Sequence, residues 1–93
     1  MPDENVVPPF DPEKVVGEYV WRAVADHVIA RIRAGELPPG ARLEGEREMS
    51  SGYGVALGTV RRARRELVER GWLRVLPAKG AFVVPAEDWP PGE

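Results

Sequence analysis

The sequence contains no cysteine and a single histidine, His27. Without thiols the chain forms neither a disulfide nor a thiolate metal site, and His27 has no second histidine with which to share a metal ion. We therefore interpret His27 as a surface or half-buried side chain, and we expect neither a metal nor any other cofactor.

Long apolar runs are also missing, and the acidic N-terminus is unlike a secretory signal. We expect a cytoplasmic protein without a membrane partner. The sequence has no glycine-rich phosphate loop after a strand, and its clustered acids Glu44, Glu46 and Glu48 are typical of a helix start rather than of a catalytic pair. An enzymatic activity is therefore not expected.

Excess positive charge is missing from the chain as a whole, whose formal net charge is −2. Its distribution is uneven: residues 1–18 carry −4, residues 85–93 carry −3, and residues 19–84 carry +5. A basic domain between two acidic ends can present a local positive surface to phosphates, although the total charge argues against it.

The 93 residues suffice for one small domain. Residues 1–16 combine four prolines with acids, and we expect a flexible arm there. The alternative is that Asp11-Pro12-Glu13 caps a helix. Residues 17–85 form the predicted folded domain, and residues 86–93 form an acidic tail.

Apolar residues recur every four positions between Glu18 and Ala34, which predicts an amphipathic helix that Gly35 ends. Its stripe consists of Val20, Val24, Val28 and Ile32. A very short strand over residues 41–43 and a short helix over residues 44–51 follow, with Met49 as the core contact of that helix.

Two glycines in three residues, Gly52 and Gly54, predict a sharp turn before a third helix that Gly71 ends. This helix has a narrow apolar seam of Val60, Ala63 and Leu67. Five of the chain's thirteen basic residues lie between positions 61 and 70. An arginine face of this kind is either solvated or used for binding.

After Gly71 the period changes from 3.6 to 2, which predicts two strands, residues 72–76 and 81–84, joined by a four-residue turn. We expect Trp72, Leu73 and Phe82 to close the core over the helices. The order of the elements is that of a winged helix-turn-helix domain, mainly α with a small β-hairpin: three helices and a two-stranded wing.

Several segments resemble the GntR family of transcriptional regulators. Residues 35–43, with Gly35, Leu37, Pro39-Gly40 and Leu43, followed by Glu46-Arg47, are similar to that family's G-x-L-x-P-G-x-x-L and S-E-R motifs. Residues 54–71 resemble its recognition helix, and residues 79–83 resemble its wing. The resemblance covers about residues 19–84.

This resemblance implies sequence-specific binding of double-stranded DNA, usually as a repressor and as a homodimer. Most members carry a further effector-binding domain after the wing. The sequence ends about nine residues after the wing, so we expect no effector domain in this chain, and a separate effector or partner protein becomes an open possibility.

The motif positions that match the family's DNA contacts are Arg47, Thr59, Arg61, Lys79 and Gly80. Two departures stand out: Glu44-Gly45 replaces a Pro-Ser pair, and Ala56-Leu57 replaces a Ser-Arg pair whose arginine often contacts DNA.

Residues at the head of a recognition helix lie nearest the bases. Gly58 would allow a close backbone approach, Thr59 would contact a phosphate or a thymine methyl, and Arg61 or Arg62 would pair with guanine. Arg47 and Lys79 would hold phosphates.

For the arginines and for Thr59, a purely structural role is the alternative to DNA contact. The arginines could form surface ion pairs with Glu66 and Glu69, Arg47 could pair with a nearby glutamate, and Thr59 could simply start a helix. Arg65 and Arg70 are expected to face solvent or phosphate. For the whole domain, the alternative function is a winged-helix protein-interaction module, which the acidic ends and the missing arginine at position 57 favour.

Overall fold

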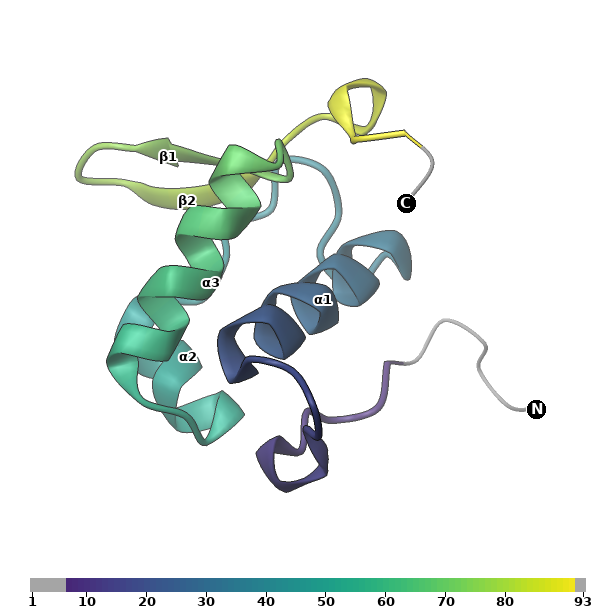
Figure 1. Cartoon of the computed structure of the whole chain (residues 1–93). Helices are drawn as coiled ribbons and strands as arrows, with labels where there is room; N and C mark the ends of the chain where they lie inside the picture. Colours follow the sequence, from purple (N-terminus) through teal and green to yellow (C-terminus); the bar gives the residue numbers. More distant parts are fainter. Residues whose placement is uncertain (1–6, 92–93) are drawn as a thin grey trace.

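The computed structural model describes residues 7–91. Three α-helices pack together, with a β-hairpin beside them (Figure 1). The fold is the predicted winged helix-turn-helix. The described chain enters and leaves on the side opposite the tip of the hairpin (Figure 1).

Helix α1 spans Val20–Arg33, close to the predicted residues 18–34, and Gly35 follows it with a φ of 85°. Val24, Val28 and Ile32 of the predicted stripe are fully buried. The first member of the stripe, Val20, is 36% exposed, because it lies at the free end of the helix.

Helix α2 spans Glu46–Tyr53, two residues later than predicted, and Gly52 lies inside it. The turn is made by Gly54 alone, which adopts a φ of 69° and donates its N–H to the carbonyl of Ser50 at 3.0 Å. The Ser50 hydroxyl closes the same turn by donating to the carbonyl of Val55 at 2.6 Å. Met49 is buried, as predicted.

Helix α3 spans Leu57–Glu69, so it begins three residues later than the stretch 54–71 that the sequence indicated. Gly71 follows with a φ of 90°, which confirms the predicted left-handed stop. Val60, Ala63 and Leu67 are fully buried and belong to the same core cluster as the buried face of α1. The two helices cross at the centre of the molecule, and α2 lies behind α3 in this view (Figure 1).

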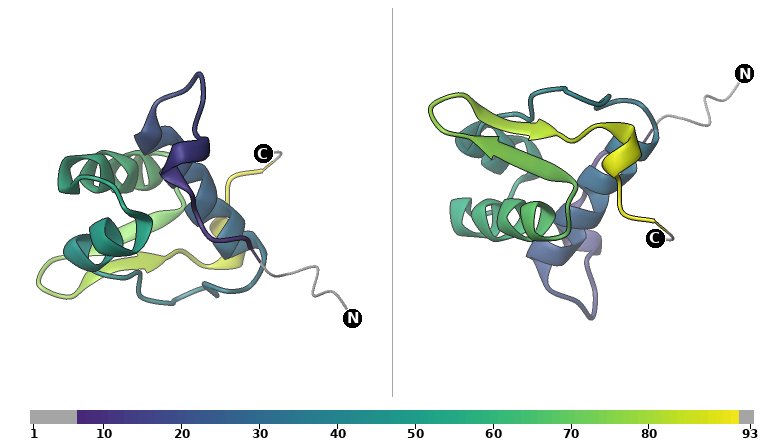
Figure 2. Two further views of the ribbon diagram at one scale, coloured as in Figure 1. Left: turned by 90° about the horizontal axis from the view of Figure 1, so that it is seen from below. Right: turned by 90° about the horizontal axis from the view of Figure 1, so that it is seen from above.

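The wing consists of β1, Leu73–Leu76, and β2, Gly80–Val83, which pair antiparallel. The strand expected at residues 41–43 exists as a single antiparallel bridge between Arg42 and Phe82. The wing lies alongside α3 and projects beyond the helices (Figures 1 and 2).

The prediction that Trp72, Leu73 and Phe82 close the core is correct for the first two, which are 1% and 3% exposed. For Phe82 it is wrong: this side chain is only half-buried, while its neighbours Ala81 and Val83 are buried. Successive side chains of a strand point to opposite faces, so the register that turns Ala81 and Val83 inward turns Phe82 outward.

The described part of the N-terminal arm makes defined contacts. Phe10 packs against His27 and Tyr53, with ring centroids 5.6 and 5.2 Å away. Asp11 caps a single 3-10 turn, Pro12–Lys14, by accepting a hydrogen bond from the N–H of Glu13 at 3.0 Å, so the capping alternative is confirmed as one short turn. Flexibility of the arm stays a prediction, and residues 1–6 lie outside the described part of the chain.

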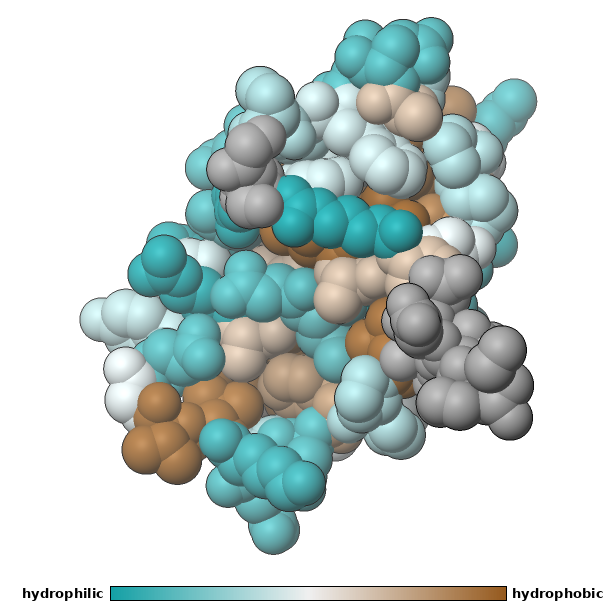
Figure 3. Space-filling view, turned by 90° about the vertical axis from the view of Figure 1, so that its right-hand side faces the viewer, coloured by the Kyte–Doolittle hydropathy of each residue, from teal (hydrophilic) through white to brown (hydrophobic). Residues whose placement is uncertain are grey.

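The tail forms one 3-10 turn, Ala86–Asp88, and then places Trp89 beside Trp72, with ring centroids 5.8 Å apart. The indole N–H of Trp89 donates to the carbonyl of Val84 at 3.1 Å. Seen from this side, away from the wing tip, hydrophilic side chains cover much of the surface and hydrophobic atoms show between them (Figure 3). Within residues 7–91, no helix has the length and apolar character that crossing a bilayer requires.

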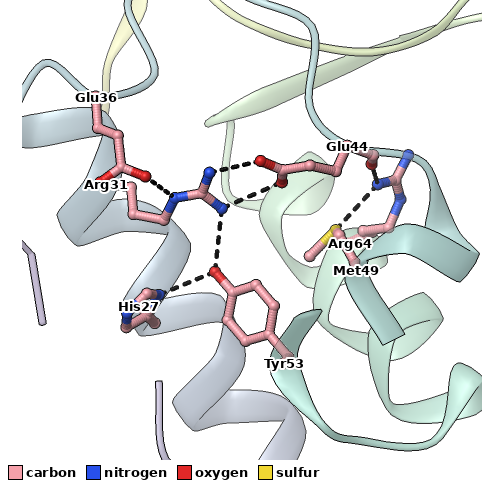
Figure 4. A network of polar contacts seen from close by, with 7 residues as sticks. All are labelled: His27, Arg31, Glu36, Glu44, Met49, Tyr53 and Arg64. Atoms are coloured by element: carbon pink, nitrogen blue, oxygen red, sulfur yellow. Dashed lines mark hydrogen bonds and ion pairs between the residues drawn. The ribbon is translucent and has the colours of Figure 1, made fainter. Parts of the chain in front are cut away.

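A polar network joins α1 to the segment before α2 (Figure 4). Arg31, only 11% exposed, pairs with Glu44 through bonds of 2.6 and 3.2 Å and with Glu36 at 2.7 Å. It also donates to the hydroxyl of Tyr53 at 3.3 Å, and that hydroxyl lies 2.9 Å from Nδ1 of His27. Glu44 thus has a structural partner at the position where the GntR motif that this segment resembles usually has proline.

His27 is half-buried, as expected from its sequence context. Its Nε2 lies 2.7 Å from the carbonyl oxygen of Pro8. Because a carbonyl only accepts, Nε2 carries a proton and donates this hydrogen bond to Pro8.

We predict that Glu44→Gln lowers the free energy of unfolding by roughly 1–3 kcal/mol at neutral pH, because it leaves Arg31 without its strongest partner. The hydrogen bond from Arg31 holds the pKa of Glu44 below its usual range. Its contribution to stability is therefore complete above the unfolded pKa and disappears as the pH falls through the lower, folded pKa.

Urea unfolding at a series of pH values measures this effect. The wild type should lose more stability than Glu44→Gln between neutral and acidic pH. Glu48→Gln, which changes an exposed carboxylate of α2, is the matched control and should shift stability by less than about 0.5 kcal/mol. Equal acid sensitivity of all three proteins would contradict the assignment.

Candidate nucleic-acid interface

The outer face of α3 is set by the burial of its inner face. Because Val60, Ala63 and Leu67 are fully buried, Arg61 and Arg65 point away from the core and are exposed. Helix and wing run side by side in the view from above (Figure 2, right).

A groove lies between α3 and the wing. Five cationic side chains line it, together with two carboxylates and several apolar residues. The cations are Arg42, Arg61, Arg64, Arg65 and Lys79, the carboxylates are Glu46 and Glu69, and the apolar residues include Val68, Val75 and Leu76. The groove therefore has a positive balance although the chain as a whole is negative, and such a surface attracts phosphates.

Of the predicted contact residues, Arg61, Lys79 and Gly80 come together in this groove. Arg61 is 55% exposed, and its Nε donates to Glu46 at 3.0 Å. The ion pair considered from the sequence therefore exists, but its partner comes from α2 rather than from α3. The pair is surface-exposed, so it is weak enough for Arg61 to exchange Glu46 for another acceptor.

Arg62 lies elsewhere: its guanidinium carbon sits 4.5 Å from the ring centroid of Trp21 on α1. The two neighbouring arginines predicted to share base readout thus have different surroundings, one in the groove and one against an aromatic ring. Arg70 also faces α1, where it pairs with Asp26 at 3.8 Å. This pairing supports the interpretation of Arg70 as a member of a surface ion pair rather than a DNA contact.

Arg47, Gly58 and Thr59 are placed by α2 and the first turn of α3. Arg47 is exposed, and of the ion pairs found within residues 7–91 none involves it. Gly58 is exposed as well, and a Cβ added there would meet nothing within 4 Å, so the fold itself does not require glycine. Thr59 is half-buried. A role in DNA contact stays a prediction for all three.

Arg42 and Arg64 are groove residues that the sequence patterns did not single out. Arg64 is half-buried, donates to the carbonyl of Glu44 at 2.7 Å and lies 3.2 Å from the sulfur of Met49. Burial lowers the pKa of Arg64, and the charges of Glu46 and Glu44 oppose this shift only in part. The sequence predicted a short strand at residues 41–43, but only the structure places Arg42 beside the wing, through its bridge to Phe82.

The tip of the wing is tightly constrained. Gly80 has a φ of 119°, and a Cβ added to it would lie 2.9 Å from Nε of Arg42. The side chain of Arg42 therefore approaches the backbone of Gly80 closely, and a role of Gly80 in DNA contact stays a prediction. Ala78 adopts a φ of 64°, a left-handed conformation that residues other than glycine seldom take.

Comparison with known proteins identifies this architecture. The family described as "Bacterial regulatory proteins, gntR family" matches residues 21–83. The chain belongs to this family. A GntR-family relative, the mannosyl-D-glycerate transport/metabolism system repressor MngR of Escherichia coli (strain K12), is 38% identical over 64 residues, covering 69% of this chain and 27% of that repressor.

Two solved structures extend the likeness. YtrA from Sulfolobus acidocaldarius, a GntR-family transcription factor, matches with a TM-score of 0.73 and 32% identity over 85% of this chain and 82% of its own. The DNA-binding domain of AraR, solved in complex with operator ORX1, matches with a TM-score of 0.67 and 25% identity over 83% of this chain and 89% of its own.

The chain spans between 26% and 55% of the length of five curated GntR-type relatives that it matches. These relatives are transcriptional regulators by name, and none of the names states an enzymatic activity. The shared part is the DNA-binding domain, and it contains the whole groove.

We predict that Gly80→Ala destabilises this GntR domain by on the order of 1–3 kcal/mol, because it forces an unfavourable φ and a clash with Arg42. Denaturant unfolding measures the effect. In an Arg42→Ala background the same substitution should cost less, since the clash is removed while the φ remains unfavourable. Identical costs in the two backgrounds would show that Arg42 does not crowd Gly80.

Proposed function

We propose that this GntR-family chain is a sequence-specific regulator that represses transcription by binding double-stranded DNA as a homodimer. The observation that carries the proposal is the groove between α3 and the wing, with its five cationic side chains. A recognition helix that enters the major groove beside a basic wing would place these cations along the phosphate backbone.

Within this proposal the head of α3 reads bases. Arg61 exchanges its bond with Glu46 for a guanine edge, to which a guanidinium donates two parallel hydrogen bonds. Arg62 remains a candidate for a backbone contact, since Trp21 holds it on the side of α1. Arg47 and Lys79, both exposed, bind phosphates.

The repressor role is supported by the printed names of relatives, among them MngR. A DNA-binding role agrees with the cytoplasmic location expected from the sequence. This location stays a prediction. Control by an effector on another chain stays a prediction too.

The test begins with selection of bound sequences from random duplex DNA, followed by titration of the selected site at several salt concentrations. Binding should weaken steeply as salt rises, with a slope of about −0.9 for each neutralised phosphate. Failure of the pure protein to bind any duplex at low salt would refute the proposal. A stable protein partner without DNA binding would favour the interaction module instead.

We predict that Arg61→Ala removes about 1–3 kcal/mol of discrimination between the selected site and a site with one altered base pair. The thermal midpoint should change little, because the exposed pair with Glu46 is worth at most about 1 kcal/mol. Arg70→Ala, at the residue that directly follows α3, is the matched control, and it should leave DNA binding nearly unchanged because Arg70 pairs with Asp26. Equal loss in both variants would remove Arg61 from base readout.

One half-site offers limited specificity, so we also expect two copies on the DNA. An exposed apolar patch at the start of α1, with Val16 84% and Tyr19 72% exposed, offers a surface for that contact. Light scattering should show a 2:1 complex with a palindromic duplex, and Tyr19→Glu should favour the 1:1 complex while leaving the melting temperature nearly unchanged. A 1:1 complex of the wild type at saturating protein would contradict the dimer.

A further inference from the structure

Arg42 occupies a position between the recognition helix and the wing. Its backbone pairs with Phe82, and on either side the N–H of Leu43 donates to Ala81 at 2.8 Å and the N–H of Val83 donates to Ala41 at 2.9 Å. The segment before α2 is thus attached to the two-stranded wing by one isolated β-bridge.

The side chain of Arg42 reaches along the wing to its tip. Its Nε donates to the carbonyl of Lys79 at 2.9 Å, and its guanidinium lies directly over Gly80, where a Cβ would approach Nε to 2.9 Å. The guanidinium is planar, so a residue without a side chain provides the flat surface on which it can lie. Arg42 and Gly80 therefore act as a pair.

The wing tip needs such a support. Between Leu76 and Lys79 the turn passes through Ala78, whose φ of 64° is unfavourable for an L-residue. Conformations of this kind persist when the surrounding contacts hold them. The bond from Arg42 holds the Lys79–Gly80 peptide, and so it restrains the backbone from which the exposed side chain of Lys79 projects.

The two Nη atoms of Arg42 are available as hydrogen-bond donors. The side chain is exposed and lines the groove together with Arg61 and Arg65. Its Nε is used by Lys79, but the hydrogen bonds and ion pairs found within residues 7–91 leave both Nη atoms without a partner. Two terminal nitrogens that donate side by side suit a phosphate group, which accepts bidentate hydrogen bonds from arginine.

None of the ion pairs found within residues 7–91 involves Arg42, which shares the groove with the cationic Arg64. Glu46, a carboxylate that lines the same groove, is bonded to Arg61 instead. An anion between α3 and the wing would give Arg42 an acidic partner. The DNA backbone supplies such an anion in the orientation proposed above.

We propose that Arg42 binds a DNA phosphate through its Nη groups while its Nε holds the wing tip in position for Lys79. This inference rests on the proposed DNA-binding function and adds to it a contact residue outside both the recognition helix and the wing. The two roles reinforce each other, because the phosphate that Arg42 binds and the phosphate that Lys79 reaches are held at one fixed separation.

The experiment compares four forms of the whole chain on the selected duplex: wild type, Arg42→Gln, Arg42→Lys and Arg74→Gln. Arg74 is the matched control, since it is an exposed arginine of β1 that lines a different hollow and is not among the groove residues. For each form the affinity is measured at several salt concentrations. Amide hydrogen exchange of residues 78–80 reports on the wing, and circular dichroism reports on folding.

Arg42→Gln should weaken binding several-fold for every sequence alike and reduce the steepness of the salt dependence by about 0.9, the amount expected for one phosphate. Arg42→Lys keeps the charge and should keep most of the salt dependence. It should still lose affinity, and it should speed amide exchange at the wing tip, because lysine has no Nε–H donor beside its terminal group. Arg74→Gln should change neither quantity by more than about twofold, as expected for a charge without a phosphate partner.

The outcomes separate the two levels of the proposal. If the wild type binds no duplex, the DNA-binding function itself fails. If the wild type binds and Arg42→Gln has the salt dependence of Arg74→Gln, the phosphate contact at Arg42 is refuted while the DNA-binding function stands. If Arg42→Lys matches the wild type in affinity and in amide exchange, the support of the wing tip is refuted.

Discussion

The burial of the α3 seam against α1 is the contact on which the rest of this molecule depends. Val60, Ala63 and Leu67 have no exposed surface, and at about 25 cal/mol per Å² of apolar area their removal from water is a main contribution to stability. A helix that buries one side must present the other, and in α3 the other side carries arginines. The hydrophobic core therefore also determines the direction in which the charges point.

The polar contacts then divide these charges between structure and binding. Arg31 and Arg64 are held by Glu44, through its carboxylate and its carbonyl respectively, and they tie α1 and α3 to the start of α2. Arg62 and Arg70 face α1. The other cations of the groove, Arg42, Arg61, Arg65 and Lys79, lie beside the wing. A nucleic acid would meet these side chains.

Much of this architecture could be predicted from local patterns. The stripe of α1, the seam of α3 and the glycines at positions 35, 54 and 71 indicated three helices and their ends, because periodicity and left-handed turns are properties of short segments. The core positions Met49, Trp72 and Leu73 were also correct. The start of α2 was predicted two residues too early, at Glu44 instead of Glu46. Glu44 lies before the helix, where its carboxylate pairs with Arg31.

Predictions failed or stayed incomplete where a partner distant in sequence decides the outcome. Phe82 turned outward because strand register depends on pairing with β1 and with Arg42, not on the hydrophobicity of a single side chain. Arg61 and Arg62, adjacent in the sequence, found different partners because successive positions of a helix point about 100° apart. Gly80 stays a predicted DNA contact, and the structure adds that its missing side chain makes room for Arg42.

The sequence by itself determined the class of fold, the basic character of residues 19–84 and the family motifs, because each of these resides in local spacing or in composition. Only the tertiary structure decided which cations share one groove. Arg42, Arg61 and Lys79 are separated by up to 37 positions, and their meeting depends on how the core packs α3 against α1 and on how one β-bridge attaches the segment before α2 to the wing. Such long-range packing is a property of the whole chain, and no single stretch of residues contains it.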